Sequence, residues 1–152
     1  MICGQVKLML KLTHDIKRDA NHIRNLLYDK HPYNIYRFPV LRFAEMIGMK
    51  INSNLPLSRE SKLDVLVYLC ESIGYQAQTK VKESHCFFFT REVIKYPARE
   101  LALELMIPSH VLAYYVYYTP GSTIDGFKTT CDLFDVTEIQ MYYAMRKNNL
   151  TI

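Results

Sequence analysis

Ala98-Arg99-Glu100-Leu101-Ala102-Leu103-Glu104-Leu105-Met106-Ile107-Pro108 is the most specific stretch of this sequence. It predicts a helix from about Ala98 to Met106 that ends before Pro108, because the residue preceding a proline disfavours helical backbone. Ser109 restarts a helix that runs through the tyrosine-rich segment Val111–Tyr118. We therefore expect two consecutive helices here, separated by a proline.

Three further helices are predicted on the N-terminal side. Thr13 is a candidate cap for a helix to about Lys30, with Asp15 suited to its positive dipole end. Pro39 suits the first turn of a second helix that Gly48 ends. A third helix runs from near Ser58 to Gly74, and its apolar residues cover more than half of its circumference, which favours a central position.

The strand candidates lie on both sides of the third helix. Met49–Ile51 is a short candidate before it. After it, Tyr75–Glu83 is weakly strand-like and the aromatic segment Cys86–Thr90 is strongly so, which together predict a hairpin. Two short helices are expected between Ile124 and Asn149. The sequence thus predicts an α+β fold, mainly helical, with a small β-hairpin or sheet.

Composition narrows the class of protein. A length of 152 residues fits one domain, residues 1–152, and the 49% hydrophobic content excludes a disordered chain. Apolar runs fall short of the ~20 residues that a membrane-spanning helix needs, so we expect a cytoplasmic protein. The four cysteines show no zinc-finger spacing, which favours buried free thiols. The net charge of +4 is concentrated in residues 1–50.

The order of motifs resembles that of the ImmA/IrrE metallopeptidase family. In Ala98–Pro108, the alanines and the final proline match a helix that follows the third zinc ligand of the family. The tail resembles the family's end at Phe134–Glu138, Met141, Tyr143 and Leu150, and the start resembles it at Ala20-Asn21 and Val40–Ile51. The resemblance implies an ImmA/IrrE-like scaffold, truncated in the sheet region because Ile51–Ser58 is short.

The zinc chemistry of that family does not carry over to this sequence. The family uses H-E-x-x-H on one helix, with two histidine ligands and a glutamate that activates water. In one register, Cys70, Glu71 and Gly74 occupy those three positions, and Pro97 stands where the family has a glutamate ligand. The resemblance therefore implies a catalytically inactive regulatory protein without a cofactor. Its expected partner is a helix-turn-helix transcriptional regulator of phage or mobile-element type.

Two alternatives involve a metal ion. The first is a zinc-dependent endopeptidase with atypical ligands. The second is a site built from Cys70, Glu71, His85 and Cys86, which requires the hairpin to fold back on the third helix. Packing residues are the commoner explanation, because free cysteines are usually buried.

DNA binding is a further alternative, through the segment 127–147. The region of about 124–149 fits a helix-turn-helix, with the turn at Asp135-Val136. The residues expected to face DNA from the second helix are Thr137, Gln140, Tyr143, Arg146 and Lys147. Residues 127–152 carry no net charge, which is unfavourable for contact with phosphates.

The surplus of tyrosine favours a protein interface. Twelve tyrosines are many for this length, and exposed tyrosines are enriched in protein–protein contacts. The candidate partner-binding residues are Tyr114, Tyr115, Tyr117, Tyr118 and Tyr142. We therefore expect the chain to act by binding a protein.

Overall fold

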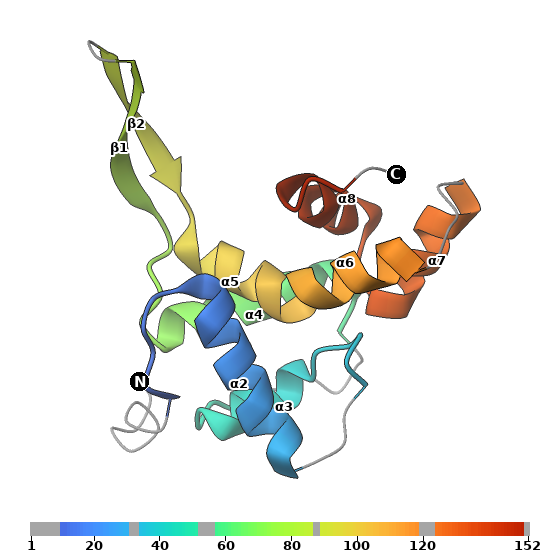
Figure 1. Cartoon of the computed structure of the whole chain (residues 1–152). Helices are drawn as coiled ribbons and strands as arrows, with labels where there is room; N and C mark the ends of the chain where they lie inside the picture. Colours follow the sequence, from blue (N-terminus) through green and yellow to red (C-terminus); the bar gives the residue numbers. More distant parts are fainter. Residues whose placement is uncertain (1–9, 31–33, 52–56, 87–88, 119–123, 151–152) are drawn as a thin grey trace.

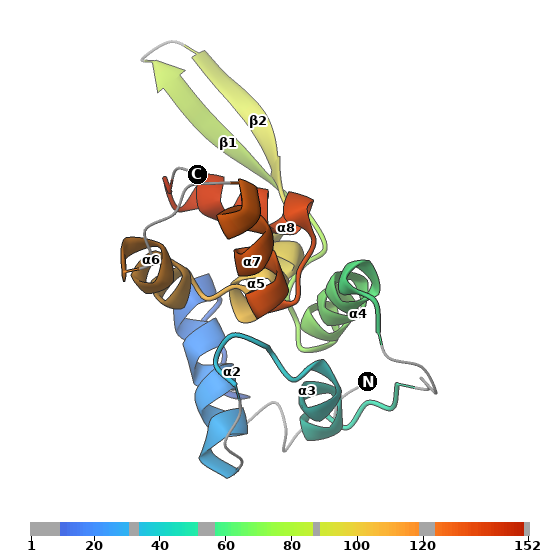
Figure 2. The same cartoon turned by 90° about the vertical axis from the view of Figure 1, so that its right-hand side faces the viewer.

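Helix α5, Pro97–Met106, forms the centre of the fold and packs mainly against α4 and α2. The computed structural model describes residues 10–30, 34–51, 57–86, 89–118 and 124–150. Figures 1 and 2 show a body of helices from which one hairpin projects. The α+β class, mainly helical, is confirmed.

The elements follow the chain in a simple order. The N-terminal half contains α2 (Ile16–Lys30), α3 (Val40–Met46) and α4 (Arg59–Ser72). The hairpin consists of β1 (Thr79–Cys86) and β2 (Phe89–Lys95). After α5, the remaining helices are α6 (Ser109–Tyr118), α7 (Ile124–Phe134) and α8 (Glu138–Lys147).

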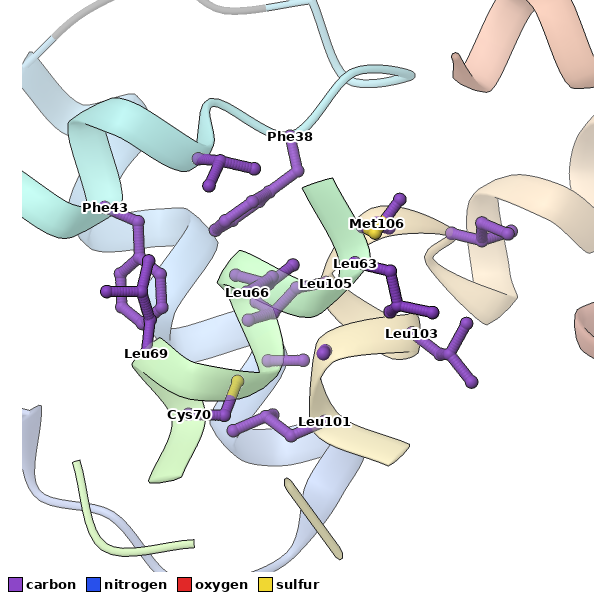
Figure 3. Close-up of a cluster of buried hydrophobic side chains, with 14 of the residues drawn as sticks. Phe38, Phe43, Leu63, Leu66, Leu69, Cys70, Leu101, Leu103, Leu105 and Met106 are labelled. Carbon is purple, nitrogen blue, oxygen red and sulfur yellow. The ribbon is translucent and has the colours of Figure 1, made fainter. Parts of the chain in front are cut away.

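The hydrophobic core lies between α4, α5, α2 and α3. Every residue of α5 from Leu101 to Met106 is buried, and Figure 3 shows Leu101 and Leu105 facing α4. Phe38 and Phe43 close the core from the α3 side in an edge-on contact, with ring centroids 5.7 Å apart. The predicted central position of Ser58–Gly74 is confirmed by the burial of Leu63, Leu66, Leu69 and Cys70.

Helix ends follow the predicted signals, with one exception. The Ser58 hydroxyl accepts a hydrogen bond from the Ser61 amide, so Ser58 caps α4. Gly48 and Gly74 both adopt positive φ where α3 and α4 end, a conformation that glycine reaches without strain. The prediction for Thr13 was wrong. Asp15 caps α2 by accepting from the Arg18 amide, because the Thr13 hydroxyl instead donates to Asp19.

The hairpin is confirmed, but its strands differ from the predicted ones. The antiparallel pairing places Val81 opposite Val93 and Thr79 opposite Lys95. Tyr75 lies outside β1, and the predicted strand Cys86–Thr90 is divided between the end of β1 at Cys86 and the start of β2 at Phe89 (Figure 1). Because both faces of this ribbon are largely exposed, its sequence carries no alternation that marks the strand limits.

Met49–Ile51 is not a strand, so that prediction was wrong. The Met49 amide donates to the Ala44 carbonyl and completes the turn at the end of α3, and no strand of the described chain lies beside this segment. None of the helices described here has the length and apolar character needed to cross a membrane.

Candidate docking surface

The beginning of α8 is fixed by a reciprocal cap. The Thr137 hydroxyl accepts from the Gln140 amide, and the Gln140 side chain accepts from the Thr137 amide at 3.0 Å. The Gln140 side chain also donates to the Arg59 carbonyl at 3.3 Å. Gln140 is therefore buried and fully engaged, and it anchors α8 on α4.

The turn between α7 and α8 is pinned to the start of α4 by charge. Asp135 adopts positive φ at this turn, a conformation that aspartate tolerates better than most residues. Its carboxylate pairs with Arg59 at 3.1 Å and with Lys62. Burial alone would raise the pKa of Asp135, but these two cations hold it below its ordinary value. The turn is thus a built junction between distant parts of the chain.

Helix α8 presents apolar residues on two faces. The inner face packs into the core through Met141, Ala144 and Met145. The outer face, defined as Ile139, Tyr142, Tyr143 and Arg146, follows the spacing i, i+3, i+4 and i+7 and faces solvent. Ile139 is 81% exposed and Tyr142 is 54% exposed. A helix with an unburied apolar face is typical of a docking element.

A groove joins this outer face to the base of the hairpin. This basal groove has a volume of about 700 Å³. Its walls combine the end of β2, the first turn of α5 and the last turns of α8, and they consist of Ile16, Ile94, Lys95, Tyr96, Arg99, Glu100, Tyr143 and Lys147. Ile94 and Tyr96 are each about half exposed. The groove is therefore apolar and aromatic with a basic rim.

One carboxylate holds the two sides of the basal groove together. The Tyr143 hydroxyl donates to Glu100 Oε1 at 2.5 Å, and Lys147 Nζ donates to Oε2. Burial opposes ionisation of Glu100, but both donors and the charges of Lys147 and Arg99 lower its pKa below the ordinary value. The hydrogen bond to Glu100, with burial, raises the pKa of Tyr143 to about 12. The groove is thus preformed between α5 and α8.

Positive charge lines the groove at Lys95, Arg99 and Lys147 and continues along the hairpin. The hairpin, the first turn of α5 and the end of α8 (residues 79–100 and 143–149) carry seven basic and three acidic residues. Their net charge of +4 equals that of the whole chain. Lys95 and Arg99 form no ion pair within the described residues, so their charge is available to a partner.

The predicted tyrosines do not form one cluster. Tyr114 on α6 is 63% exposed and Tyr142 on α8 belongs to the outer face. Tyr115 packs edge-on against Phe134 and Tyr36, with ring centroids 6.4 Å and 6.2 Å away, and so supports the fold. The side chains of Tyr117 and Tyr118 lie outside the described residues. Tyr96, Ile94 and Ile139 were not predicted as partner-binding residues. The i, i+3 spacing of Ile139 and Tyr142 in the sequence could have identified Ile139.

The degenerate zinc positions occupy four different environments. Cys70 is buried among the leucines of α4 and α5 (Figure 3), and burial raises the pKa of its thiol. Glu71 is exposed, Gly74 forms the turn after α4, and Pro97 opens α5. The described residues contain no cluster of three or more histidine, cysteine or acidic side chains able to hold a metal ion.

The alternative site of Cys70, Glu71, His85 and Cys86 required the hairpin to fold back on α4, and that prediction was wrong. Cys86 ends β1 at the far end of a hairpin that points away from the helices (Figures 1 and 2), whereas Cys70 lies in the core. The antiparallel ladder keeps β1 extended along β2, and this holds His85 and Cys86 away from Cys70.

The residues predicted to face DNA are mostly engaged within the chain. Thr137 and Gln140 cap α8, and Tyr143 and Lys147 bind Glu100. Among these five residues, Arg146 is the one whose exposed side chain forms no hydrogen bond or ion pair in the described residues. Comparisons of this chain with protein-family models, with curated proteins and with solved structures found no match.

Proposed function

We propose that this chain is a catalytically inactive regulatory protein that binds an acidic segment of a protein partner. The observation that carries the proposal is the continuous surface formed by the outer face of α8 and the basal groove, which share Tyr143. Exposed aliphatic and aromatic side chains stand there beside unpaired basic groups. Such a surface offers both apolar anchors and charge complementarity to a partner.

The apolar part of the surface supplies binding energy. Fully burying a side chain such as that of Ile139 stabilises a complex by about 1.5–3 kcal/mol. Tyrosine and arginine are the residues in which interface energy most often concentrates, and Tyr142, Tyr143 and Arg146 adjoin Ile139 on the same helix face. We therefore expect α8 to hold the centre of the interface.

The basic part of the surface selects the partner. Lys95 and Arg99 border the groove without carboxylate partners in the described residues, so an acidic segment gains favourable contacts with them. Exposed charges of this kind are screened by salt. The affinity of the complex is therefore expected to fall as ionic strength rises.

The resemblance to the ImmA/IrrE family supplies the class of partner. Members of that family regulate helix-turn-helix repressors in phages and mobile elements, so the proposed partner is a transcriptional regulator of this type in the cytoplasm. The proposal rests on analogy for the partner's identity and on the α8 surface for the mode of binding.

A protein partner accounts for the α8 surface better than a DNA duplex does. Base readout needs exposed polar side chains, whereas Gln140 is buried and Tyr143 and Lys147 are bound to Glu100. The most exposed large hydrophobic residue on this helix is Ile139, which offers nothing to phosphates. The surface thus favours an apolar and acidic protein segment.

Site-specific photocrosslinking in the cells that encode this chain tests the proposal. A photoreactive residue is placed at Ile139 or Tyr142, with Tyr68 on α4 as the matched control because it is similarly exposed at 58%. The proposal predicts one protein crosslinked from α8 and absent at position 68, with an acidic segment at the crosslink. Crosslinks to nucleic acid alone, or identical products from all three positions, contradict it.

A further inference from the structure

A second cavity lies between α2, the end of α5, α6 and Asn148 after α8, and it shares no lining residue with the basal groove. Its volume is about 610 Å³, and polar side chains dominate its walls: Lys17, Asn21, Asn25, Glu104, Ser109, His110 and Asn148, together with Ala113. Lys17, Asn21 and Asn25 share one face of α2 at a spacing of four residues. The cavity is therefore a pocket of mainly polar side chains built by α2, α5 and α6, with Asn148 after the end of α8.

A buried cation stands behind this pocket. Arg24 is only 5% exposed, and its guanidinium donates to Asn21 Oδ1 at 2.9 Å and to the Glu104 carbonyl. Both of these acceptor residues line the pocket. Arg24 Nε has no hydrogen-bond partner, and Arg24 forms no ion pair within the described residues. A buried charge with an unused donor is costly unless an anion or acceptor satisfies it.

The carboxylate of Glu104 favours the charged form of Arg24 electrostatically, but no hydrogen bond joins it to Arg24. Both oxygens of Glu104 accept from Ser109, at 2.8 Å from its amide and at 2.6 and 2.9 Å from its hydroxyl, and so cap α6. Burial and the positive charge of Arg24 lower the pKa of His110, although Glu104 acts in the opposite direction. The carboxylate of Glu104 is thus hydrogen-bonded to the start of α6 and leaves Arg24 Nε without a partner.

The remaining hydrogen-bonding groups define the ligand further. Asn21 uses its oxygen for Arg24, which leaves its amide hydrogens for a ligand, and Asn25 adds a second carboxamide. Asn148 donates to the Ala144 carbonyl at 2.8 Å, which leaves its side-chain oxygen as an acceptor at the opposite wall. The volume exceeds that of an inorganic ion. We infer that this pocket binds a small polar molecule through a phosphate or carboxylate group at Lys17, Asn21 and Asn25, in front of the buried charge of Arg24.

Titration of the whole chain with sodium phosphate and with sodium acetate, each against sodium chloride at equal ionic strength, tests this inference. Amide and side-chain NMR signals of Lys17, His110 and Asn148 report the site. The inference predicts saturable shifts with at least one oxyanion, with a dissociation constant of about 1 mM, equivalent to about −4 kcal/mol. If phosphate and acetate both produce the same chemical-shift changes as chloride, the inference is wrong for both classes of anion.

Variants locate the binding. Lys17→Ala with Asn25→Ala is expected to weaken the binding at least tenfold, whereas Lys128→Ala, an exposed lysine on α7, leaves it unchanged. Arg24→Lys keeps the positive charge but removes the guanidinium group that holds Asn21 Oδ1 and the Glu104 carbonyl. This variant is expected to bind more weakly and to retain the NMR spectrum of the folded chain. Because Lys17 and Asn25 are exposed, the double variant is expected to fold. It therefore still tests the inference if Arg24→Lys fails to fold. Equal affinity in the double variant and in Lys128→Ala overturns the inference.

Discussion

The hydroxyl of Tyr143 donates a hydrogen bond of 2.5 Å to Glu100, a residue that precedes it by 43 positions. Lys147, one turn further along α8, donates to the second oxygen of the same carboxylate. A single side chain of α5 therefore holds two groups of the proposed docking helix. The geometry of the basal groove depends on this junction.

Glu100→Gln is expected to lower the free energy of unfolding by about 1 kcal/mol at pH 7, because the ion pair is partly exposed and screened. The folded-state pKa of Glu100 is lowered, so its contribution is present above the unfolded-state pKa and is lost as pH falls through the folded-state value. Urea unfolding at pH 7 and at pH 3 measures this. A difference between variant and wild type that is equally large at pH 3 contradicts the assignment.

Asp19 is the most connected buried carboxylate of the described chain. It accepts from the Thr13 amide and hydroxyl, from the His14 amide and from the Tyr75 hydroxyl, and it is 1% exposed. Asp19→Asn is expected to lower the free energy of unfolding by about 2–3 kcal/mol, because charge-assisted hydrogen bonds are lost in a buried site. Asp15→Asn serves as the exposed control. A loss below about 0.5 kcal/mol in chemical denaturation contradicts this role.

Asp135→Asn separates charge from backbone conformation at the α7–α8 turn. Asparagine tolerates the positive φ of this position, so the variant removes mainly the ion pairs to Arg59 and Lys62. We expect a loss of about 1 kcal/mol that shrinks in 1 M salt. Thermal unfolding at low and high salt measures it. A loss that is independent of salt indicates strain instead of lost charge pairing.

The outer hairpin is expected to be dispensable for the helical core. Of the described residues between Gln76 and Pro97, none belongs to the hydrophobic core. Replacing 82–92 by Asn-Gly joins Val81 to Val93 through a tight turn that suits antiparallel strands. The free energy of unfolding is expected to change by less than about 1 kcal/mol in urea titration. Loss of cooperative unfolding shows that the hairpin supports the core.

Helices were predictable from this sequence because their ends carry strong local signals. Ser58, Gly48, Gly74 and Pro108 each mark a boundary within one or two residues of the observed one. The limits of the strands were not predictable, because the exposed ribbon buries neither face and the aromatic segment Cys86–Thr90 is divided between β1 and β2. Local patterns thus identified the elements that build the core.

The candidate site was only partly predictable, because it depends on contacts between distant segments. Sequence pattern placed Gln140 outward as a polar residue, but its cap with Thr137 and its bond to Arg59 bury it. Tyr143 and Lys147 were recognised as exposed candidates, whereas their shared acceptor on α5 could not be. Ile94 and Tyr96 line the groove because β2 leads directly into α5.

The affinity of the crosslinked partner for purified variants of this chain tests the docking proposal most directly. Ile139→Ala and Tyr142→Ala are expected to weaken binding by about tenfold or more each, or at least 1.4 kcal/mol, as central interface residues do. The double variant Lys95→Ala with Arg99→Ala is expected to reduce the dependence of the binding affinity on salt concentration. The control variant Tyr68→Ala is expected to bind the partner as the wild type does. Unchanged affinity in Ile139→Ala and Tyr142→Ala, with every variant folded, contradicts the proposal that α8 docks the partner.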